Sequence, residues 1–213
     1  MLKHYPGLIK KHLNHFLTLN AMILTPAEIL DIIIMTLAVG FIFKDIFRYR
    51  PRVEVITPDS FLKMRKGFNW NDFWFAAAIV APSIILHEFG HKFIAISQGM
   101  TATFNAAYIW LGVGVVLKLI GSGIIFFVPA FVAIQGQGTS LQFAGIAFAG
   151  PAVNLILWLG SLIILKTAKL KPNLHRFFYL LSRINMFLFI FNMLPIPGFD
   201  GLQVYSGLLA GLL

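Results

Sequence analysis

Four long apolar runs constrain the fold of this chain more than any other feature of its sequence. They cover residues 26–47, 73–99, 141–165 and 177–194. Each is close to or above the roughly 20 residues that an apolar helix needs to cross a bilayer. A bilayer offers no partner for backbone hydrogen bonds, so spanning segments of this kind are expected to be helical. We therefore expect an all-α membrane protein, a polytopic bundle of about four to six transmembrane helices.

The composition agrees with a chain that is embedded almost entirely in a membrane. Of its 213 residues, 58% are hydrophobic and only 12% are charged. This leaves little material for a soluble domain, so residues 26–213 are interpreted as one membrane-embedded domain. Residues 1–25 place apolar side chains three or four positions apart between lysines, which predicts an amphipathic segment at the membrane interface. We expect a multi-pass integral protein of the cell membrane.

The charge and the cysteine content narrow the possible partners and cofactors. The formal net charge is +9, and the basic residues stand beside the apolar runs. That placement favours contact with membrane lipids and argues against nucleic acid as a partner. The chain contains no cysteine, so a metal ion would have to be bound by nitrogen and oxygen atoms.

Residues 104–134 are apolar but lack the pattern of one straight span. Four glycines and Pro129 interrupt them. We expect a short helix near 106–120, followed by an extended segment at 124–134 that forms a small re-entrant or β-hairpin element.

The remaining connections are predicted from their polarity and length. The polar loop 48–71 contains an alternating stretch at 52–56 that is compatible with a short edge strand, and residues 166–176 are expected to be a basic connection. After Gly201 only 12 residues remain. They amount to roughly 18 Å of helix, less than the bilayer core, so the last helix is expected to be partial or cut short.

The second apolar run contains the sequence His87-Glu88-Phe89-Gly90-His91. On a helix, His87 and His91 project from one face and can bind a single Zn²⁺, while Glu88 lies beside them, within reach of a water molecule. Two histidines and a glutamate inside an apolar span cost several kcal/mol unless something compensates, which indicates a functional site. The alternative is a hydrogen-bonded structural cluster.

A catalytic zinc site takes a third protein ligand and leaves one position open for water. After His91 the sequence contains one carboxylate, Asp200, and one histidine, His175. His175 stands in a basic connection, where a solvated residue is expected. Asp200 follows a tight apolar turn rich in proline, and we predict that it is the third ligand. The alternative for Asp200 is the N-cap of the last helix.

Three motifs, taken together, resemble the site-2 proteases, which are intramembrane zinc metalloproteases. The motifs stand in the family's order: His87-Glu88-x-x-His91, Gly150-Pro151-x-x-Asn154, and Asn192-x-x-Pro195 leading to Asp200-Gly201. The resemblance covers roughly residues 75–205. The resemblance implies that each chain binds one Zn²⁺ through His87, His91 and Asp200. It implies that Glu88 is the catalytic carboxylate. It also implies that Asn192 and Asn154 orient the substrate or stabilise the oxyanion. Phe199 stands where the family usually has leucine, a conservative difference. For Gly150, Pro151 and Asn154 the alternative is a role in helix packing alone.

The function expected from the motifs is hydrolysis of peptide bonds in or near the transmembrane helices of membrane-protein substrates. Zinc would activate a water molecule, and Glu88 would act as general base and then as general acid. A substrate helix must unwind, so we expect it to pair as a strand with the extended segment, through Ile124, Phe126 and Val128. The alternative for this segment is a re-entrant hairpin with a packing role only.

Two other functions are compatible with part of this sequence. A catalytically inactive relative would bind membrane-protein clients without cleaving them, but an idle buried carboxylate at Glu88 argues against it. A metalloprotease of the prenyl-protein type would need a downstream glutamate as ligand. No glutamate follows Glu88 in the sequence, which nearly excludes that type.

Overall fold

The computed structural model describes residues 24–47, 68–123 and 130–212. The predicted strand at 52–56 and nearly all of the predicted interfacial segment lie outside the described residues. The helices and strands, in chain order, are α2 (Pro26–Phe43), α4 (Trp70–Ser97), β1 (Thr101–Ala106), α5 (Tyr108–Leu119), β2 (Ala130–Gln135), α6 (Ser140–Thr167), α7 (Pro172–Asn192) and α8 (Asp200–Leu212).

Four of these helices, α2, α4, α6 and α7, are long and apolar enough to cross a membrane. Many large apolar side chains on their outer faces are exposed, Ile156 and Ile163 of α6 among them. A surface of this kind suits contact with lipid chains. The predicted multi-pass helical bundle with a small hairpin is confirmed.

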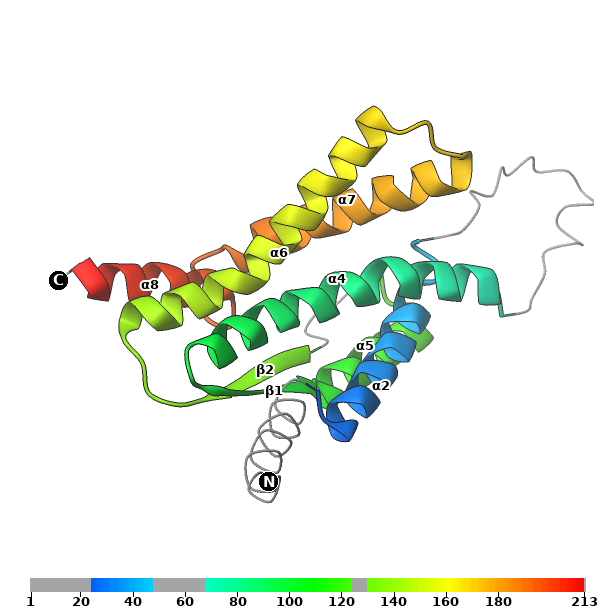
Figure 1. Cartoon of the computed structure of the whole chain (residues 1–213). Coiled ribbons are helices and arrows are strands. Elements are labelled where there is room, and N and C mark those ends of the chain that lie inside the picture. The colour runs from blue at the N-terminus through cyan, green and yellow to red at the C-terminus, as the bar shows by residue number, and fades with distance from the viewer. Residues whose placement is uncertain (1–23, 48–67, 124–129, 213) are drawn as a thin grey trace, which may run out of the picture.

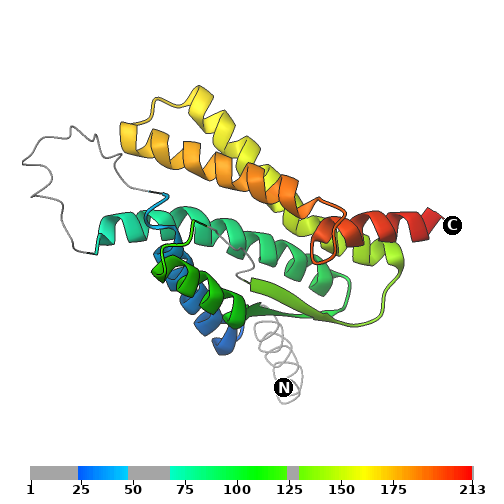
Figure 2. The same cartoon turned by 180° about the vertical axis from the view of Figure 1, so that it is seen from behind.

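Helix α4 is the central element of the bundle. It contacts α2, α6, α7 and both strands. Figure 1 shows α6 and α7 on one side of α4 and α2 with α5 on the other, and Figure 2 shows the same order from behind. Ala76, Ile79 and Val80 of α4 are fully buried. A Cβ on Gly40 of α2 would lie 3.0 Å from Ala77 Cβ, so the two helices touch closely there.

Helix α2 begins with the signal that its sequence carries. Thr25 is the N-cap, Pro26 takes the first helical position, and Glu28 completes a capping box: Glu28 N–H donates to Thr25 Oγ1 (3.2 Å) and Thr25 N–H donates to Glu28 Oε2 (2.7 Å). The Glu28 carboxylate also accepts hydrogen bonds from Lys92 and Phe104, which are distant in the sequence.

The strands β1 and β2 form an antiparallel hairpin that begins directly after α4. Thr101 lies opposite Gln135 and Ala106 opposite Ala130. The connection between the two strands contains α5, the short helix expected near 106–120. β2 overlaps the extended segment predicted at 124–134, of which residues 124–129 lie outside the described part of the chain.

The structure corrects two sequence-based assignments. β1 was not predicted. Helix α7 begins at Pro172, although residues 166–176 were expected to be a connection and the span to begin at 177. Proline at a first helical position starts a helix even where the flanking residues are basic. The connection between α6 and α7 is therefore only 168–171.

Candidate metal centre

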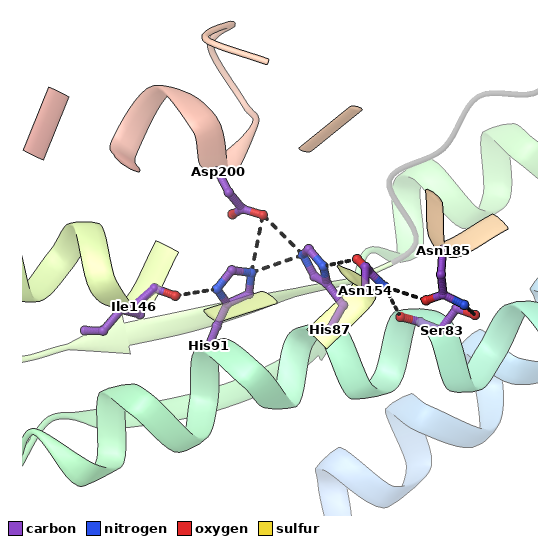
Figure 3. A network of polar contacts seen from close by, with 7 residues as sticks. All are labelled: Ser83, His87, His91, Ile146, Asn154, Asn185 and Asp200. Carbon is purple, nitrogen blue, oxygen red and sulfur yellow. Dashed lines mark hydrogen bonds and ion pairs between the residues drawn. The ribbon is translucent and has the colours of Figure 1, made fainter. Parts of the chain in front are cut away.

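His87 and His91 project from the same face of α4, one helical turn apart, and both are buried. Their Nε2 atoms lie 3.1 Å from each other. Oδ2 of Asp200, at the start of α8, lies 3.2 Å from Nε2 of His87 and 3.4 Å from Nε2 of His91. Figure 3 shows the carboxylate facing both imidazoles. The structure thus brings together the three side chains predicted to bind zinc.

The other nitrogen of each imidazole is held by an oxygen atom. Nδ1 of His91 lies 2.8 Å from the carbonyl oxygen of Ile146 in α6, and Nδ1 of His87 lies 2.6 Å from Oδ1 of Asn154, also in α6. Both oxygens are acceptors, so each Nδ1 carries the proton and donates it. In the neutral form that binds a metal, each Nε2 is then unprotonated and presents a lone pair to the space in front of Asp200.

The orientation of the Asn154 amide is fixed by its own partners. Its Nδ2 donates to the carbonyl oxygen of Ser83 (3.1 Å) and to Oδ1 of Asn185 in α7 (2.9 Å). Asn185 in turn donates from Nδ2 to Ser83 Oγ (2.9 Å) and to the carbonyl oxygen of Leu181 (2.8 Å). A reversed amide on Asn154 would place its oxygen against two acceptors, the carbonyl oxygen of Ser83 and Oδ1 of Asn185, so its oxygen must face His87.

The distances within this cluster fit a zinc ion. Two imidazole lone pairs and a carboxylate oxygen converge within 3.4 Å, an arrangement of three acceptors that repel each other unless a cation lies among them. In a tetrahedral zinc site with bonds of about 2.0–2.1 Å, neighbouring ligand atoms are about 3.3 Å apart. The donor set of two nitrogens and one oxygen is one that zinc accepts.

Glycines allow the helices that carry the ligands to approach one another. A Cβ on Gly150 of α6 would collide with the imidazole of His91 and would lie 2.7 Å from Nε2 of His87. A Cβ on Gly201 would collide with the backbone carbonyl of Met193 at the end of α7. Gly150 therefore leaves space for both ligands on α4, and Gly201 lets α8 begin where Asp200 reaches them.

The metal centre opens into a cavity of about 430 Å³. The metal-binding side chains and Glu88 form one part of its wall, β2 forms another, and the end of α7 with Asn192 forms a third. Glu88 is 8% exposed and lies next to His87 in the chain. Among the described residues, none forms a hydrogen bond with its carboxylate, which leaves its oxygens free to hold water in the cavity.

Proteins similar to this chain come from several microorganisms. "Putative zinc metalloprotease MJ0611" of Methanocaldococcus jannaschii is 32% identical over 178 residues, which are 83% of this chain and 82% of the relative. This similarity extends over most of both proteins. The chain belongs to the site-2 protease family.

Two further relatives of this site-2 protease family member share shorter segments with it. "Putative zinc metalloprotease sll0528" of Synechocystis sp. is 26% identical over 148 residues, 70% of this chain and 35% of the relative. "Putative zinc metalloprotease Rip2" of Mycolicibacterium smegmatis is 31% identical over 134 residues, 56% of this chain and 51% of the relative. The chain thus spans about a third and about half of the length of these two. No family model matches the chain, and no solved structure matches it.

The names of the three relatives and the cluster of His87, His91 and Asp200 indicate the same cofactor, which is zinc. Of the other residues that the resemblance to site-2 proteases singled out, Asn192 lines the cavity. Asn154 is completely buried behind His87, and its amide is fully engaged there. The predicted substrate contacts lie outside the described residues: Ile124, Phe126 and Val128.

Sequence reasoning missed four side chains of this site-2 protease family member that support the centre. Ser83 and Asn185 extend the hydrogen bonds of Asn154, and Glu28 and Lys92 form an ion pair with both side chains 1% exposed. Their position inside apolar spans indicates that these polar residues have partners on other helices, because an unpaired polar side chain is costly in a membrane. The sequence alone does not show which partner each one takes.

Proposed function

We propose that this chain is an intramembrane zinc metalloprotease that hydrolyses peptide bonds in or near the transmembrane helices of other membrane proteins. One observation carries the proposal. Two of the three side chains of the metal centre stand on α4, the central apolar helix, and the centre opens into a cavity that is bounded by a β-strand. Peptide hydrolysis needs an activated water molecule and an unwound substrate. The metal centre would activate the water, and the strand would bind the unwound substrate.

The metal would be held by Nε2 of His87, Nε2 of His91 and a carboxylate oxygen of Asp200. When bound, zinc supplies Lewis acidity toward water and toward the scissile carbonyl. With three protein ligands, one coordination position stays open on the cavity side. The oxygen atoms of Asn154 and Ile146 hold both imidazoles in the tautomer and orientation that this requires.

Glu88 would be the general base and then the general acid. Its carboxylate lines the cavity next to the metal-binding face of α4. It would take a proton from the attacking water as the carbon–oxygen bond forms. It would then give the proton to the amine as the carbon–nitrogen bond breaks, so the carboxylate is regenerated.

Asn192 would stabilise the oxyanion. It stands at the end of α7, on the wall of the cavity, and its amide is a neutral donor. A neutral donor stabilises developing negative charge without the cost of placing another ion inside the bilayer. Asn154 would act on the reaction only through His87, because all its hydrogen bonds are made to protein groups.

The substrate would bind to β2 as an added strand. A transmembrane helix that unwinds for cleavage exposes backbone donors and acceptors that need partners in the bilayer. Phe131, Val132 and Ile134 of β2 line the cavity beside the metal centre. A strand that pairs with β2 would satisfy the substrate backbone and pass its peptide bonds in front of Glu88.

The test is cleavage of a reporter peptide by the purified full chain in lipid vesicles. The reporter is a single span of about 20 apolar residues with a central Gly–Gly pair that eases unwinding. The wild-type chain should cleave it near that pair, and Glu88→Gln should abolish cleavage while the bound zinc persists. Asp45→Asn, which removes a carboxylate outside the site, serves as the matched control and should cleave normally.

The opposite outcome has a clear meaning. Equal proteolysis by wild type and Glu88→Gln would refute the mechanism. Tight binding of the reporter with no cleavage by the wild-type chain would instead indicate a protein that retains membrane clients. We propose the cell membrane as the location, with membrane lipids and single-span proteins as the partners.

A further inference from the structure

Two carboxylates of α2 cover the edge of β1 that faces away from β2. Oε1 of Glu28 accepts a hydrogen bond from the backbone N–H of Phe104 (2.7 Å), and Oδ2 of Asp31 accepts one from the N–H of Ala106 (3.0 Å). Glu28 and Asp31 are three positions apart and so lie on one face of α2. Phe104 and Ala106 are two positions apart, the spacing at which a strand repeats its orientation.

The register of the hairpin shows which edge these carboxylates occupy. In an antiparallel pair, alternate residues direct their backbone groups toward the partner strand and then away from it. Since Phe104 and Ala106 donate to α2, their N–H groups point away from β2. Their opposite residues, Val132 and Ala130, must then direct their own backbone groups away from β1. Both of these residues line the cavity of the metal centre.

Glu28 also connects this edge to the helix that carries the metal ligands. Its Oε1 accepts from Lys92 Nζ as well as from Phe104 N–H, and Lys92 directly follows His91. Glu28 and Lys92 are each 1% exposed. A buried ion pair between fixed elements holds its geometry, because breaking it leaves an uncompensated charge. α2, the metal-binding turn of α4 and β1 are thereby fixed to one another.

We propose that Glu28 and Asp31 are positioning residues that close the outer edge of the hairpin, so that a substrate strand can add only to β2, in register with Ala130 and Val132. An uncovered strand edge pairs with any extended chain, and a carboxylate that occupies its donors prevents this. Within the part of the chain that the structure describes, the edge left open is that of β2, beside the metal centre. This inference rests on the proposed function, because it assumes a substrate that binds as a strand.

The test is disulfide cross-linking, which the absence of native cysteine makes clean. Thr103 and Ala133 lie directly opposite each other, one on each strand. A strand added to β2 runs about 4.8 Å from Ala133 and about twice that distance from Thr103, whereas a disulfide requires Cα atoms within roughly 7 Å. Thr103→Cys and Ala133→Cys are therefore a matched pair of reporters. Each is placed in Glu88→Gln, so that the peptide is bound but not cut.

The probe is the single-span reporter peptide with its central Gly–Gly pair, carrying one cysteine at successive positions around that pair. We expect the adduct at Ala133→Cys to exceed the adduct at Thr103→Cys about tenfold, since only the former is within reach. In Asp31→Ala, the share of adduct at Thr103→Cys should rise several-fold. In Asp31→Ala with Glu88 intact, nonproductive pairing of the peptide with the opened edge of β1 should lower kcat and KM together and leave kcat/KM unchanged. Zinc content should not change.

Three further variants separate this role from a general loss of structure. Asp31→Asn keeps an oxygen acceptor for Ala106 N–H and should restore the wild-type partition of adducts. Tyr108→Phe removes the other hydrogen bond to Asp31 without touching the strand, and should behave as wild type. Glu28→Met combined with Lys92→Met removes the second covering group without leaving an unpaired charge, and should shift the partition as Asp31→Ala does.

Each outcome bears on a stated claim. Equal adducts at both positions in chains that carry no change besides Glu88→Gln, or an unchanged partition in Asp31→Ala, would overturn the inference. Cleavage of the reporter with no adduct at Ala133→Cys would overturn it as well, while leaving the protease function intact. Absence of both cleavage and adducts would refute the proposed function, and the role of the edge would fall with it.

Discussion

Oδ1 of Asn154 lies 2.6 Å from Nδ1 of His87, on the side of the ring opposite to the metal-binding nitrogen. The contact joins α6 to α4 in a region where both side chains are buried. It fixes the proton on Nδ1 and the lone pair on Nε2. Asn154 therefore determines whether His87 is ready to bind a metal ion.

The first prediction follows from this contact. Asn154→Ala should weaken zinc binding about 10- to 100-fold, the usual effect of removing an outer partner of a metal-binding histidine. Competition with a zinc chelator measures the change. Asn105→Ala, which removes a partly exposed amide of β1, is the control and should bind zinc as wild type does. Wild-type zinc affinity in Asn154→Ala would contradict the assigned role.

The second prediction concerns the ligand set. Metal analysis should find one zinc per wild-type chain and a loss of zinc in both His87→Ala and Asp200→Ala, since two remaining ligands bind it far more weakly. His175→Ala removes an exposed histidine at the start of α7 and should retain its zinc. Full zinc occupancy in Asp200→Ala would show that the third ligand has been misassigned.

The third prediction uses two glycines of the same helix. Gly150→Ala should lower zinc content and cleavage, because the new methyl group would collide with the imidazoles of His87 and His91. A Cβ on Gly160 of α6 would meet no atom within 4 Å. Gly160→Ala should therefore keep zinc and activity and raise stability by up to about 1 kcal/mol through helix propensity. A normal zinc content in Gly150→Ala would show that the helices adjust.

The fourth prediction concerns pH. Asp45 follows α2, and its Oδ2 lies 2.6 Å from Lys118 Nζ and 3.4 Å from Lys44 Nζ. Burial by itself raises the pKa of the Asp45 carboxyl, but the hydrogen bond from Lys118 and the two positive charges bring that pKa below its ordinary value of 3.8. The contact therefore stabilises the fold at pH values above 3.8 and is lost as the pH falls through the lower, folded-state pKa.

The measurement is the difference in Tm between wild type and Asp45→Asn in detergent as a function of pH. Wild type should be the more stable by a constant margin between pH 5 and 7, and the margin should shrink to zero below the ordinary pKa of about 3.8. High salt should reduce the margin throughout, because the pair is partly exposed. A margin that grows as the pH falls would reverse the assigned sign.

The candidate site was largely predictable because the sequence offers so few alternatives. With no cysteine and a single carboxylate after His91, Asp200 was almost the only residue available to complete a site begun by two histidines on one helical face. The spans were predictable for a similar reason, since few segments of a short chain are apolar over such lengths. The predicted ligand set therefore followed from the small number of suitable residues and needed no knowledge of their positions in space.

Contacts between distant segments could not be predicted in this way. β1 escaped notice because two of its three buried positions, Ala102 and Ala106, are alanines, which give the alternation of a strand only weak contrast. Glu28 lies 64 positions from Lys92, and Asp31 lies 75 from Ala106. Nothing in the local sequence of either carboxylate indicates its partner, since each could equally lie near the headgroups at the start of its helix.

The predicted third zinc ligand, Asp200, stands at the start of α8, 109 residues after His91. At ordinary rates of synthesis, a ribosome needs on the order of 5 to 20 s to cover that distance. During this interval the membrane contains a chain with two histidines and Glu88 in place but no Asp200. Such a chain would bind zinc weakly, because only two of the three predicted ligands are present, and we expect it to be proteolytically inactive. We therefore expect activity to begin only when α8 packs onto α6 and brings Asp200 to the two histidines, so the order of synthesis delays proteolysis until the ligand set is assembled.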